Sequence, residues 1–186
     1  PNAFWKTYDV GGEPYGLVNL GLMRQKGRLI DTHRKDKDVI GTNPCAEISL
    51  ESGESCNLAE IYLPNIESEE QLIEVATRVW KVCKVVSCVP HHWPFAAEII
   101  EKNHRTGLGI TGVLQAKQFE NLPDVLDQTY KALEQTDEVF SEALTKSLDR
   151  KIGTSIKLTT VKPSGTLSLL AGVSSGIHPE YSEYYI

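Results

Sequence analysis

An α/β fold is predicted for this chain, on three observations. From Glu67 to Cys88 the apolar residues recur at spacings of four and three, which marks one face of an amphipathic helix. Two short apolar runs, 43–50 and 56–63, flank a polar turn and indicate extended segments. The β-branched run 156–161 indicates a further strand. With 186 residues, the chain has the size of one domain.

The other elements follow from turn formers, caps and helix stops. Residues 1–42 are rich in glycine and hold one basic cluster, which we interpret as a solvated loop. Ser68 is the expected N-cap of the first helix, and Pro90 ends it. Three more helices are expected, over 94–103, within 107–119 and over 123–148. After the strand, a short apolar segment ends at Gly172.

Composition and charge exclude several classes of protein. Hydrophobic residues make up 40% and charged residues 24%, which is typical of a globular protein and not of a disordered one. The net charge of -6 argues against nucleic-acid binding as the main function, so we expect no nucleic-acid partner. No apolar stretch approaches the roughly 18 residues that span a bilayer. We therefore expect a cytoplasmic protein without a membrane partner.

The four cysteines form no Cys-x-x-Cys pair. Cys83 lies on the apolar face of its helix and is predicted to be a core residue. Cys88 is followed by His91 and His92, and this Cys-x-x-His fragment offers two types of zinc ligand. A second ligand pair at comparable spacing is missing, so no metal site is predicted.

Residues 107–112 match the G-x-G-x-x-G pattern of dinucleotide-binding folds. In those folds the glycines follow a strand and open a helix, and an acidic residue about 20 positions later ends a second strand. Here they follow a segment that looks helical, and Asp127 falls inside a predicted helix. We therefore attribute the glycines to close packing of a helix against a sheet.

The segment Asn43-Pro44-Cys45-Ala46-Glu47 carries a first candidate site. Alternate side chains of an extended segment share one face, so Asn43, Cys45 and Glu47 would present an amide, a thiol and a carboxylate together. A thiol is a nucleophile or a hydrogen-atom carrier, a carboxylate is a general base, and an amide orients a hydroxyl. A strand with one buried cysteine and an exposed glutamate explains the same spacing equally well.

A second candidate site lies between the predicted strand and the final apolar segment. If Leu167 to Ala171 are helical, the free amides of Ser164, Gly165 and Thr166 form an anion site, and a phosphate is its natural ligand. Turns of this composition are also common where no ligand binds.

Four motifs follow one another along the chain. They are Asn-Pro-Cys-Ala-Glu-Ile-Ser-Leu at 43–50, Ser-Cys-Asn-Leu-Ala-Glu-Ile at 55–61, His-Arg-Thr-Gly-Leu-Gly-Ile-Thr-Gly at 104–112 and Thr-Thr-Val-Lys-Pro-Ser-Gly-Thr at 159–166. Together and in this order they resemble the catalytic core of ribonucleotide reductases. The similarity is greatest to the adenosylcobalamin-dependent, monomeric (class II) ribonucleoside-triphosphate reductases, and the short spacing between Cys45 and Cys56 favours that class.

The resemblance implies a fold and a set of roles. The chain would be part of a ten-stranded α/β barrel, with a finger loop at about 43–57, a helical region at about 67–150 and a phosphate-binding loop at about 161–172. Cys45, at the tip of the finger loop, would become a thiyl radical that removes the 3′-hydrogen of the ribose. Glu47 would accept the proton of the 3′-hydroxyl, and Asn43 would hydrogen-bond the sugar hydroxyls.

The same resemblance implies how the reaction ends and what it requires. Cys56 would be half of the dithiol that reduces the 2′ position, and the substrate phosphates would be held by Pro163, Ser164, Gly165 and Thr166. The implied activity is the reduction of ribonucleotides to 2′-deoxyribonucleotides. The implied cofactor is adenosylcobalamin, bound mostly outside this chain. The implied partners are the ribonucleotide, a thioredoxin-type reductant and the remainder of the reductase chain.

The sequence also departs from the family. Ala46 stands where glycine is frequent, and all four cysteines are assigned without the second reducing cysteine or the C-terminal pair that accepts electrons from thioredoxin. We therefore expect 1–186 to be an internal fragment that is inactive alone. Two alternatives remain open, namely a reductase of another class with a separate metal-containing radical subunit and a non-catalytic module that binds nucleotide phosphates.

Overall fold

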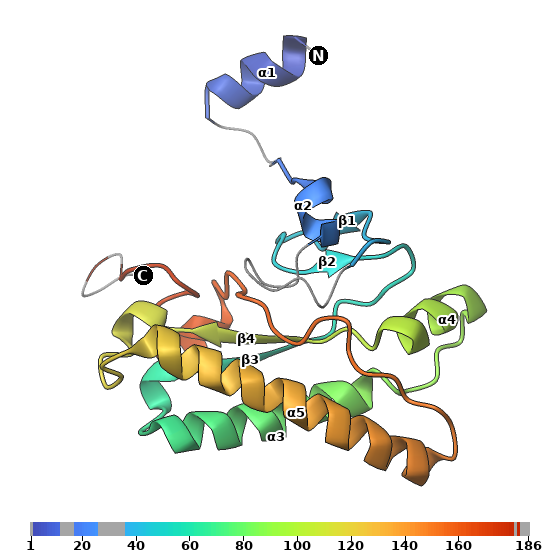
Figure 1. Ribbon diagram of the computed structural model, residues 1–186. Coiled ribbons are helices and arrows are strands. Elements are labelled where there is room, and N and C mark those ends of the chain that lie inside the picture. The colour runs from blue at the N-terminus through green and yellow to red at the C-terminus, as the bar shows by residue number, and fades with distance from the viewer. Residues whose placement is uncertain (1, 12–16, 26–35, 181, 183–186) are drawn as a thin grey trace.

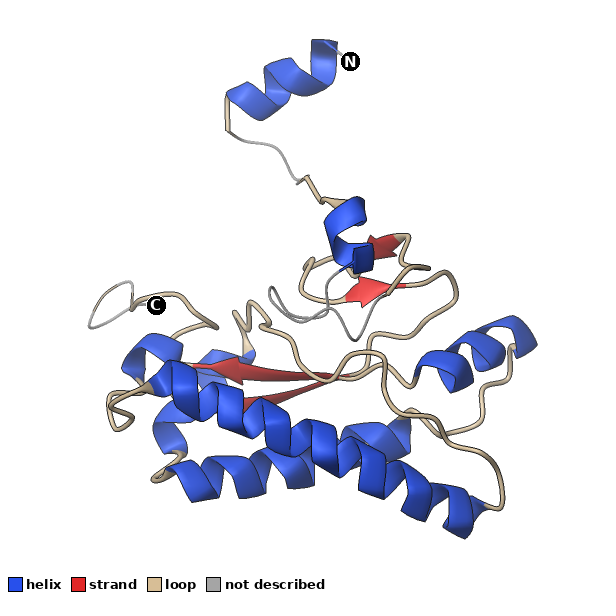
Figure 2. Cartoon of the chain, viewed as in Figure 1, coloured by secondary structure: helices blue, strands red, loops and turns tan. Residues whose placement is uncertain are grey.

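The computed structural model describes residues 2–11, 17–25, 36–180 and 182, and most of the basic cluster noted above lies outside them. In chain order the elements are α1 (Asn2–Asp9), α2 (Leu20–Gln25), β1 (Gly41–Thr42), β2 (Ser49–Leu50), β3 (Leu58–Tyr62), the 3-10 helix η1 (Leu63–Asn65), α3 (Glu69–Val86), α4 (Pro94–Asn103), β4 (Gly107–Thr111), the 3-10 helix η2 (Val113–Gln115), α5 (Leu122–Leu148) and α6 (Leu167–Ala171). Figure 2 shows them by type.

The body of the fold is a parallel pair of strands covered by two helices. β3 and β4 pair in register, with Leu58 opposite Gly107 and Glu60 opposite Gly109. α3 and α5 lie side by side against one face of this pair, and the β1–β2 hairpin lies beyond the other face (Figure 1). The predicted α/β class is confirmed in this arrangement.

The predicted strand 156–161 is present as an extended segment beside β4. Leu108 N donates to Leu158 O at 3.0 Å, and Thr160 N donates to Leu108 O at 3.0 Å. Only Thr159 forms a ladder bridge, parallel to Leu108, so the segment is not a regular strand. It nevertheless gives the order β3, β4 and then 156–160 across the sheet.

The prediction of a helix within 107–119 is wrong for the first part of this range, because Gly107 to Thr111 form β4. Glycine allows this strand to lie close to its neighbours. A Cβ atom on Gly107 would lie 2.5 Å from Leu58 Cδ2, and one on Gly109 would lie 3.3 Å from Ala59 O. The glycine pattern thus reflects close packing of strand on strand, where we had expected helix on sheet.

The other three helices are confirmed. Ser68 caps α3, since its side chain accepts a hydrogen bond from Gln71 N at 3.2 Å. α3 ends at Val86, before Pro90, and α4 spans the predicted residues. α5 begins one residue before Pro123 and ends at Leu148, as expected. Among the described helices, none combines the length and apolar character needed to cross a bilayer.

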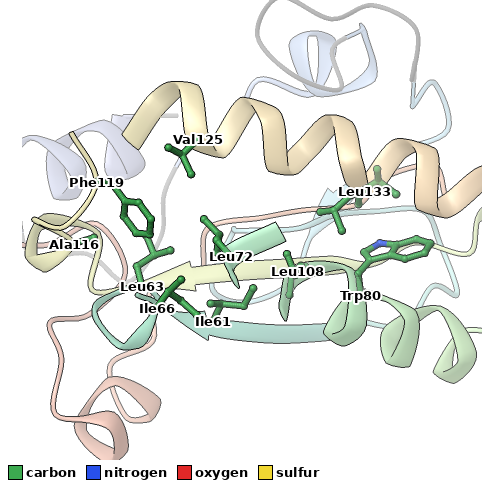
Figure 3. Packing of buried hydrophobic residues seen from close by; sticks show 12 residues of the cluster. Ile61, Leu63, Ile66, Leu72, Trp80, Leu108, Ala116, Phe119, Val125 and Leu133 are labelled. Carbon is green, nitrogen blue, oxygen red and sulfur yellow. The ribbon is translucent and has the colours of Figure 1, made fainter. Parts of the chain in front are cut away.

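The core lies between the strand pair and the two long helices (Figure 3). Trp80 on α3 and Leu133 on α5 meet there with Leu108 on β4, and each is at most 3% exposed. The indole nitrogen of Trp80 donates to Thr106 Oγ1 at 2.9 Å, so its polar atom is satisfied. The core therefore fixes the strands whose ends carry the candidate site.

A buried ion pair joins the two helices where the apolar pattern of α3 is interrupted. Lys84 on α3 and Asp137 on α5 have fully buried side chains, with Nζ 3.1 Å from Oδ1. Lys84 Nζ also donates to Gly153 O at 2.6 Å. Asp137 Oδ2 accepts from Ser155 N at 2.7 Å. The pair thus ties both helices to the chain that leads to the segment 156–160.

Replacing Lys84 with methionine is expected to lower the free energy of unfolding by about 3–5 kcal/mol, because Asp137 then stays buried without its counter-ion. The double variant Lys84→Met/Asp137→Leu should recover most of that loss, since apolar replacement of a whole buried pair is often close to neutral. Urea unfolding of the full protein measures both effects. A loss below about 1 kcal/mol for the single variant would contradict the structural role.

Candidate active site

The first candidate site is the loop of a β-hairpin. β1 and β2 pair antiparallel, with Thr42 opposite Ser49, and residues 43–48 connect them. Asn43 N donates to Ile48 O at 3.2 Å, and Ala46 N donates to Asn43 O at 3.0 Å. The expectation of an extended strand with alternating side chains is therefore wrong for these residues. Turn hydrogen bonds within the segment compete with the ladder, and Cys45 lies at the tip with an exposed side chain.

Asn43 organises the loop from inside. Its side chain is 8% exposed, and Oδ1 accepts from Ile48 N at 3.3 Å. Its Nδ2 donates to Cys56 Sγ at 3.5 Å. The same amide therefore closes the loop that carries Cys45 and contacts the second candidate cysteine.

Ala46 is in the left-handed backbone region, with φ +62. A Cβ atom is disfavoured there, whereas glycine adopts this conformation without such a cost. The hairpin is thus built with a strained alanine beside Cys45.

The carboxylate of Glu47 is buried and unpartnered. Both of its oxygens are shielded from solvent and have no hydrogen-bond partner among the described residues. The Glu47 carbonyl, in contrast, accepts a hydrogen bond from Thr160 Oγ1, which holds the hairpin against the extended segment. A carboxylate buried without a donor is costly, and a ligand hydroxyl would satisfy it.

Cys56 is exposed as a whole residue, but partial desolvation of its sulfur raises the pKa of the thiol, and the negative charge of Glu47 adds to this effect. The hydrogen bond from Asn43 opposes it. The thiol form of Cys56 is therefore favoured over the thiolate, and the thiol carries the hydrogen that a reduction step needs.

The second candidate site has the predicted strand-to-helix form, because residues 167–171 make up α6. Ser164 is 4% exposed, and its hydroxyl donates to Glu60 Oε1 on β3. Pro163, Gly165 and Thr166 are exposed. A cavity of about 750 Å³ lies beside the loop and is lined by Gly165 together with Gln115, Leu169, Gly172, Val173, Ser174, Ser175, Pro179, Glu180 and Ser182.

Glu60 connects the two candidate sites, and we did not single it out from the sequence. Burial raises the pKa of its carboxyl, the positive charge of Lys162 lowers it, and the negative charge of Glu47 raises it. The contact with Ser164 places Glu60 at the phosphate-binding loop, and its electrostatic interaction with Glu47 links it to the hairpin carboxylate. The available signal was a single acidic residue inside the otherwise apolar run from Leu58 to Tyr62.

Arg105, also missed, anchors the base of the hairpin. Its guanidinium donates to both oxygens of Asp36, at 2.5 and 3.0 Å, and its Nε donates to Glu54 Oε1 at 2.9 Å. It also contacts Ser49 Oγ on β2 at 3.2 Å. All three charged side chains are at most 1% exposed, so the pairing is shielded from solvent. Arg105 thus binds residues before and after the hairpin to the start of β4.

Replacing Arg105 with lysine is expected to loosen the hairpin, because an ammonium cannot reproduce the two-pronged contact with Asp36. Loss of one hydrogen bond to a charged group corresponds to about 1.5–3 kcal/mol. Hydrogen exchange at the amides of Ile40 and Asn43, both bonded across the hairpin, should therefore accelerate at least tenfold. Lys102→Ala is the control, since this half-exposed lysine forms surface ion pairs with Asp38 and Glu51 and should change exchange less than threefold. Unchanged exchange in the arginine variant would show that the anchor lies elsewhere.

The remaining two cysteines lie on α3 and just after its end. Cys83 is buried, as predicted for a core residue, and Cys88 is buried just beyond the end of α3, where Sγ is 3.9 Å from His104 Nδ1. His91 and His92 are exposed. Within the described ranges, no three His, Cys, Asp or Glu side chains are grouped so as to hold a metal ion.

Comparison with known proteins identifies the family of the chain. Residues 30–123 match the family described as the ribonucleotide reductase barrel domain, which is just over half of the chain. The chain is 37% identical over 207 residues to the adenosylcobalamin-dependent ribonucleoside-triphosphate reductase of Lactobacillus leichmannii, covering 94% of this chain and 27% of that protein. A probable reductase of the same name from Dictyostelium discoideum is 38% identical, over 94% of this chain and 23% of that protein.

A solved structure shows the same fold. The crystal structure of a B-12-dependent (class II) ribonucleotide reductase superposes with a TM-score of 0.76 at 36% identity, covering 90% of this chain and 27% of that one. The chain thus spans about a quarter of the length of these relatives. The chain belongs to the ribonucleotide reductase family and forms part of its α/β barrel domain.

Proposed function

We propose that the protein containing this chain reduces ribonucleoside triphosphates to 2′-deoxyribonucleotides by radical chemistry, and that this chain supplies the reacting groups. The observation that carries the proposal is the hairpin loop. It places an exposed thiol, Cys45, at its tip, two residues from the carboxylate of Glu47, which is buried and has no partner among the residues that the structure describes. The names of the relatives, which are ribonucleoside-triphosphate reductases, support the substrate class.

The proposed reaction uses these groups in sequence. Cys45, as a thiyl radical, takes the 3′-hydrogen while Glu47 accepts the proton of the 3′-hydroxyl. The 2′-hydroxyl then leaves as water, and the substrate radical that remains must gain two electrons and two protons. Cys56 and a second thiol supply these as they form a disulfide, and Cys45 returns the 3′-hydrogen. The overall change is ribonucleotide plus dithiol to deoxyribonucleotide, disulfide and water.

The second thiol of that pair comes from outside residues 1–186 in this proposal. Cys83 and Cys88 are buried, on α3 and just after it, and Cys45 is the proposed radical carrier. A thioredoxin-type reductant, acting through other parts of the whole protein, would then restore the dithiol. This partner and a cytoplasmic location complete the proposal.

Adenosylcobalamin is the proposed radical source, and when bound it supplies the radical that passes to the thiol. The position of Cys45 fits this role, because an exposed thiol at a hairpin tip is open to a group that approaches from outside the loop. The hydrogen bond of Asn43 to Cys56, in turn, keeps the reducing thiol beside the loop.

The test uses the full-length protein with a ribonucleoside triphosphate, adenosylcobalamin and a small dithiol. We expect one deoxyribonucleotide per disulfide formed, and no product when adenosylcobalamin is omitted. Product formed without adenosylcobalamin, in the presence of a separate metal-containing subunit, would assign the protein to another reductase class. Nucleotide binding without product under complete conditions would favour the non-catalytic binding module.

A further inference from the structure

The conformation of the phosphate-binding loop depends on one strained residue. Ser164 has φ +54, a left-handed conformation that costs an L-residue about 1 kcal/mol or more. Its carbonyl accepts from Ser168 N at 3.1 Å, which begins α6. Such a conformation persists only where neighbouring groups hold it. The Ser164 hydroxyl donates to Glu60 Oε1 and also lies 3.4 Å from Lys162 O, a weaker contact within the loop itself.

Glu60 reaches this loop across a strand. It lies on β3, while the loop continues the segment that pairs with the opposite side of β4. The residue of β4 that pairs with Glu60 is Gly109, which has no side chain to block the path. A Cβ atom there would lie 3.8 Å from Lys162 Cβ, so Gly109 is the point where β3 and the loop approach each other. This accounts for the middle glycine of the G-x-G-x-x-G pattern.

The two oxygens of Glu60 have different surroundings. Oε1 accepts from the Ser164 hydroxyl, whereas Oε2 is buried and has no hydrogen-bond partner among the described residues. A side chain that leaves one oxygen buried and unpartnered is not optimised for stability alone. Lys162, two residues before Ser164, supplies a positive charge that favours the carboxylate.

We propose that Glu60 is a positioning residue for substrate binding, which acts through Ser164 to hold the loop so that Gly165 and Thr166 face the nucleotide phosphates. The inference rests on the proposed function and assigns different roles within the loop. The buried Ser164 anchors it, and the exposed Gly165 and Thr166 meet the ligand. Glutamine in place of Glu60 retains the oxygen that accepts this hydrogen bond, whereas alanine does not.

The test measures KM and kcat for a ribonucleoside triphosphate in the full-length protein. Glu60→Ala should raise KM about tenfold, the effect of losing one hydrogen bond to a charged group, while kcat changes less than about threefold. Glu60→Gln should restore KM to within about threefold of the wild type. Ser164→Ala should match Glu60→Ala, and the double variant should be no worse than either, because both remove the same contact.

Ser141→Ala is the matched control. Its hydroxyl also donates to a buried carboxylate, that of Asp137, at 3.1 Å, but it lies on α5 outside the candidate site. This variant should lose a similar amount of stability and leave KM and kcat within twofold of the wild type. If the Ser141 and Ser164 variants shifted KM equally, the contact between Glu60 and Ser164 would contribute only to general stability. That result would overturn the proposal.

Equilibrium binding of the same triphosphate separates this inference from the proposed function. If the wild type binds but shows no turnover, the proposed function fails, and tenfold weaker binding by Glu60→Ala than by Glu60→Gln still supports the positioning role. If the wild type turns over and Glu60→Ala has an unchanged KM and affinity, the proposed function stands and the role of Glu60 is overturned.

Discussion

Replacing Cys45 with serine is expected to abolish nucleotide reduction in the full-length protein, with at most about 0.1% of the product-forming rate retained, a loss comparable to that of a catalytic nucleophile. The O–H bond of serine is much stronger than the S–H bond of cysteine, so serine cannot carry the radical between the cofactor and the substrate. Cys45 is exposed at the tip of the hairpin, so the change removes no buried packing. Deoxyribonucleotide formation measures the loss.

Two further measurements make this result specific. The affinity for the ribonucleoside triphosphate and the thermal unfolding midpoint of Cys45→Ser should both stay close to those of the wild type. Cys83→Ala is the control, because this buried cysteine contributes to packing and should lower stability while leaving the rate per folded molecule unchanged. Turnover retained by the serine variant would exclude Cys45 as the radical carrier.

Replacing Glu47 with glutamine is expected to reduce kcat by about 10²- to 10⁴-fold, the usual range for loss of a general base. Glutamine keeps the shape of the side chain and a hydrogen-bond acceptor but cannot take the 3′-hydroxyl proton. Rapid-quench measurement of a single turnover reports the chemical step directly. A decrease below about threefold, with chemistry rate-limiting, would mean that Glu47 has only a structural role.

The same variant should be at least as stable as the wild type. Both carboxylate oxygens of Glu47 are buried and have no partner within the described part of the chain, so the protein bears a desolvation cost that a neutral amide reduces. Glu74→Gln, on the exposed surface of α3, is the control and should change neither the rate nor the stability appreciably. A clear loss of stability in Glu47→Gln would point to an unidentified structural contact of the carboxylate.

The sequence by itself determined the elements whose signals are local. The apolar spacing and Ser68 predict α3, Pro94 predicts the start of α4, and the long amphipathic run predicts α5. The residues of both candidate sites were also identified from short motifs, because thiol, carboxylate and glycine-rich turn chemistry is encoded in a few adjacent residues. Hydrogen bonds and apolar contacts within a few turns of a helix suffice to specify such features.

The tertiary structure decided the features that depend on distant partners. Asn43 to Ile48 form a turn because β1 and β2 pair around them, and Gly107 to Thr111 become a strand because β3 and the segment 156–160 hydrogen-bond on either side. The free energy of those ladders outweighs the local preference that suggested other conformations.

The contacts of Glu60 with Ser164 and of Arg105 with Asp36 join residues that are 104 and 69 positions apart. Neither pairing leaves a periodic signal in the sequence, because the spacing between the partners is set by the fold and not by a helix or strand repeat. The sequence therefore predicted the chemical groups of the candidate site, whereas folding determined which buried charges contact them.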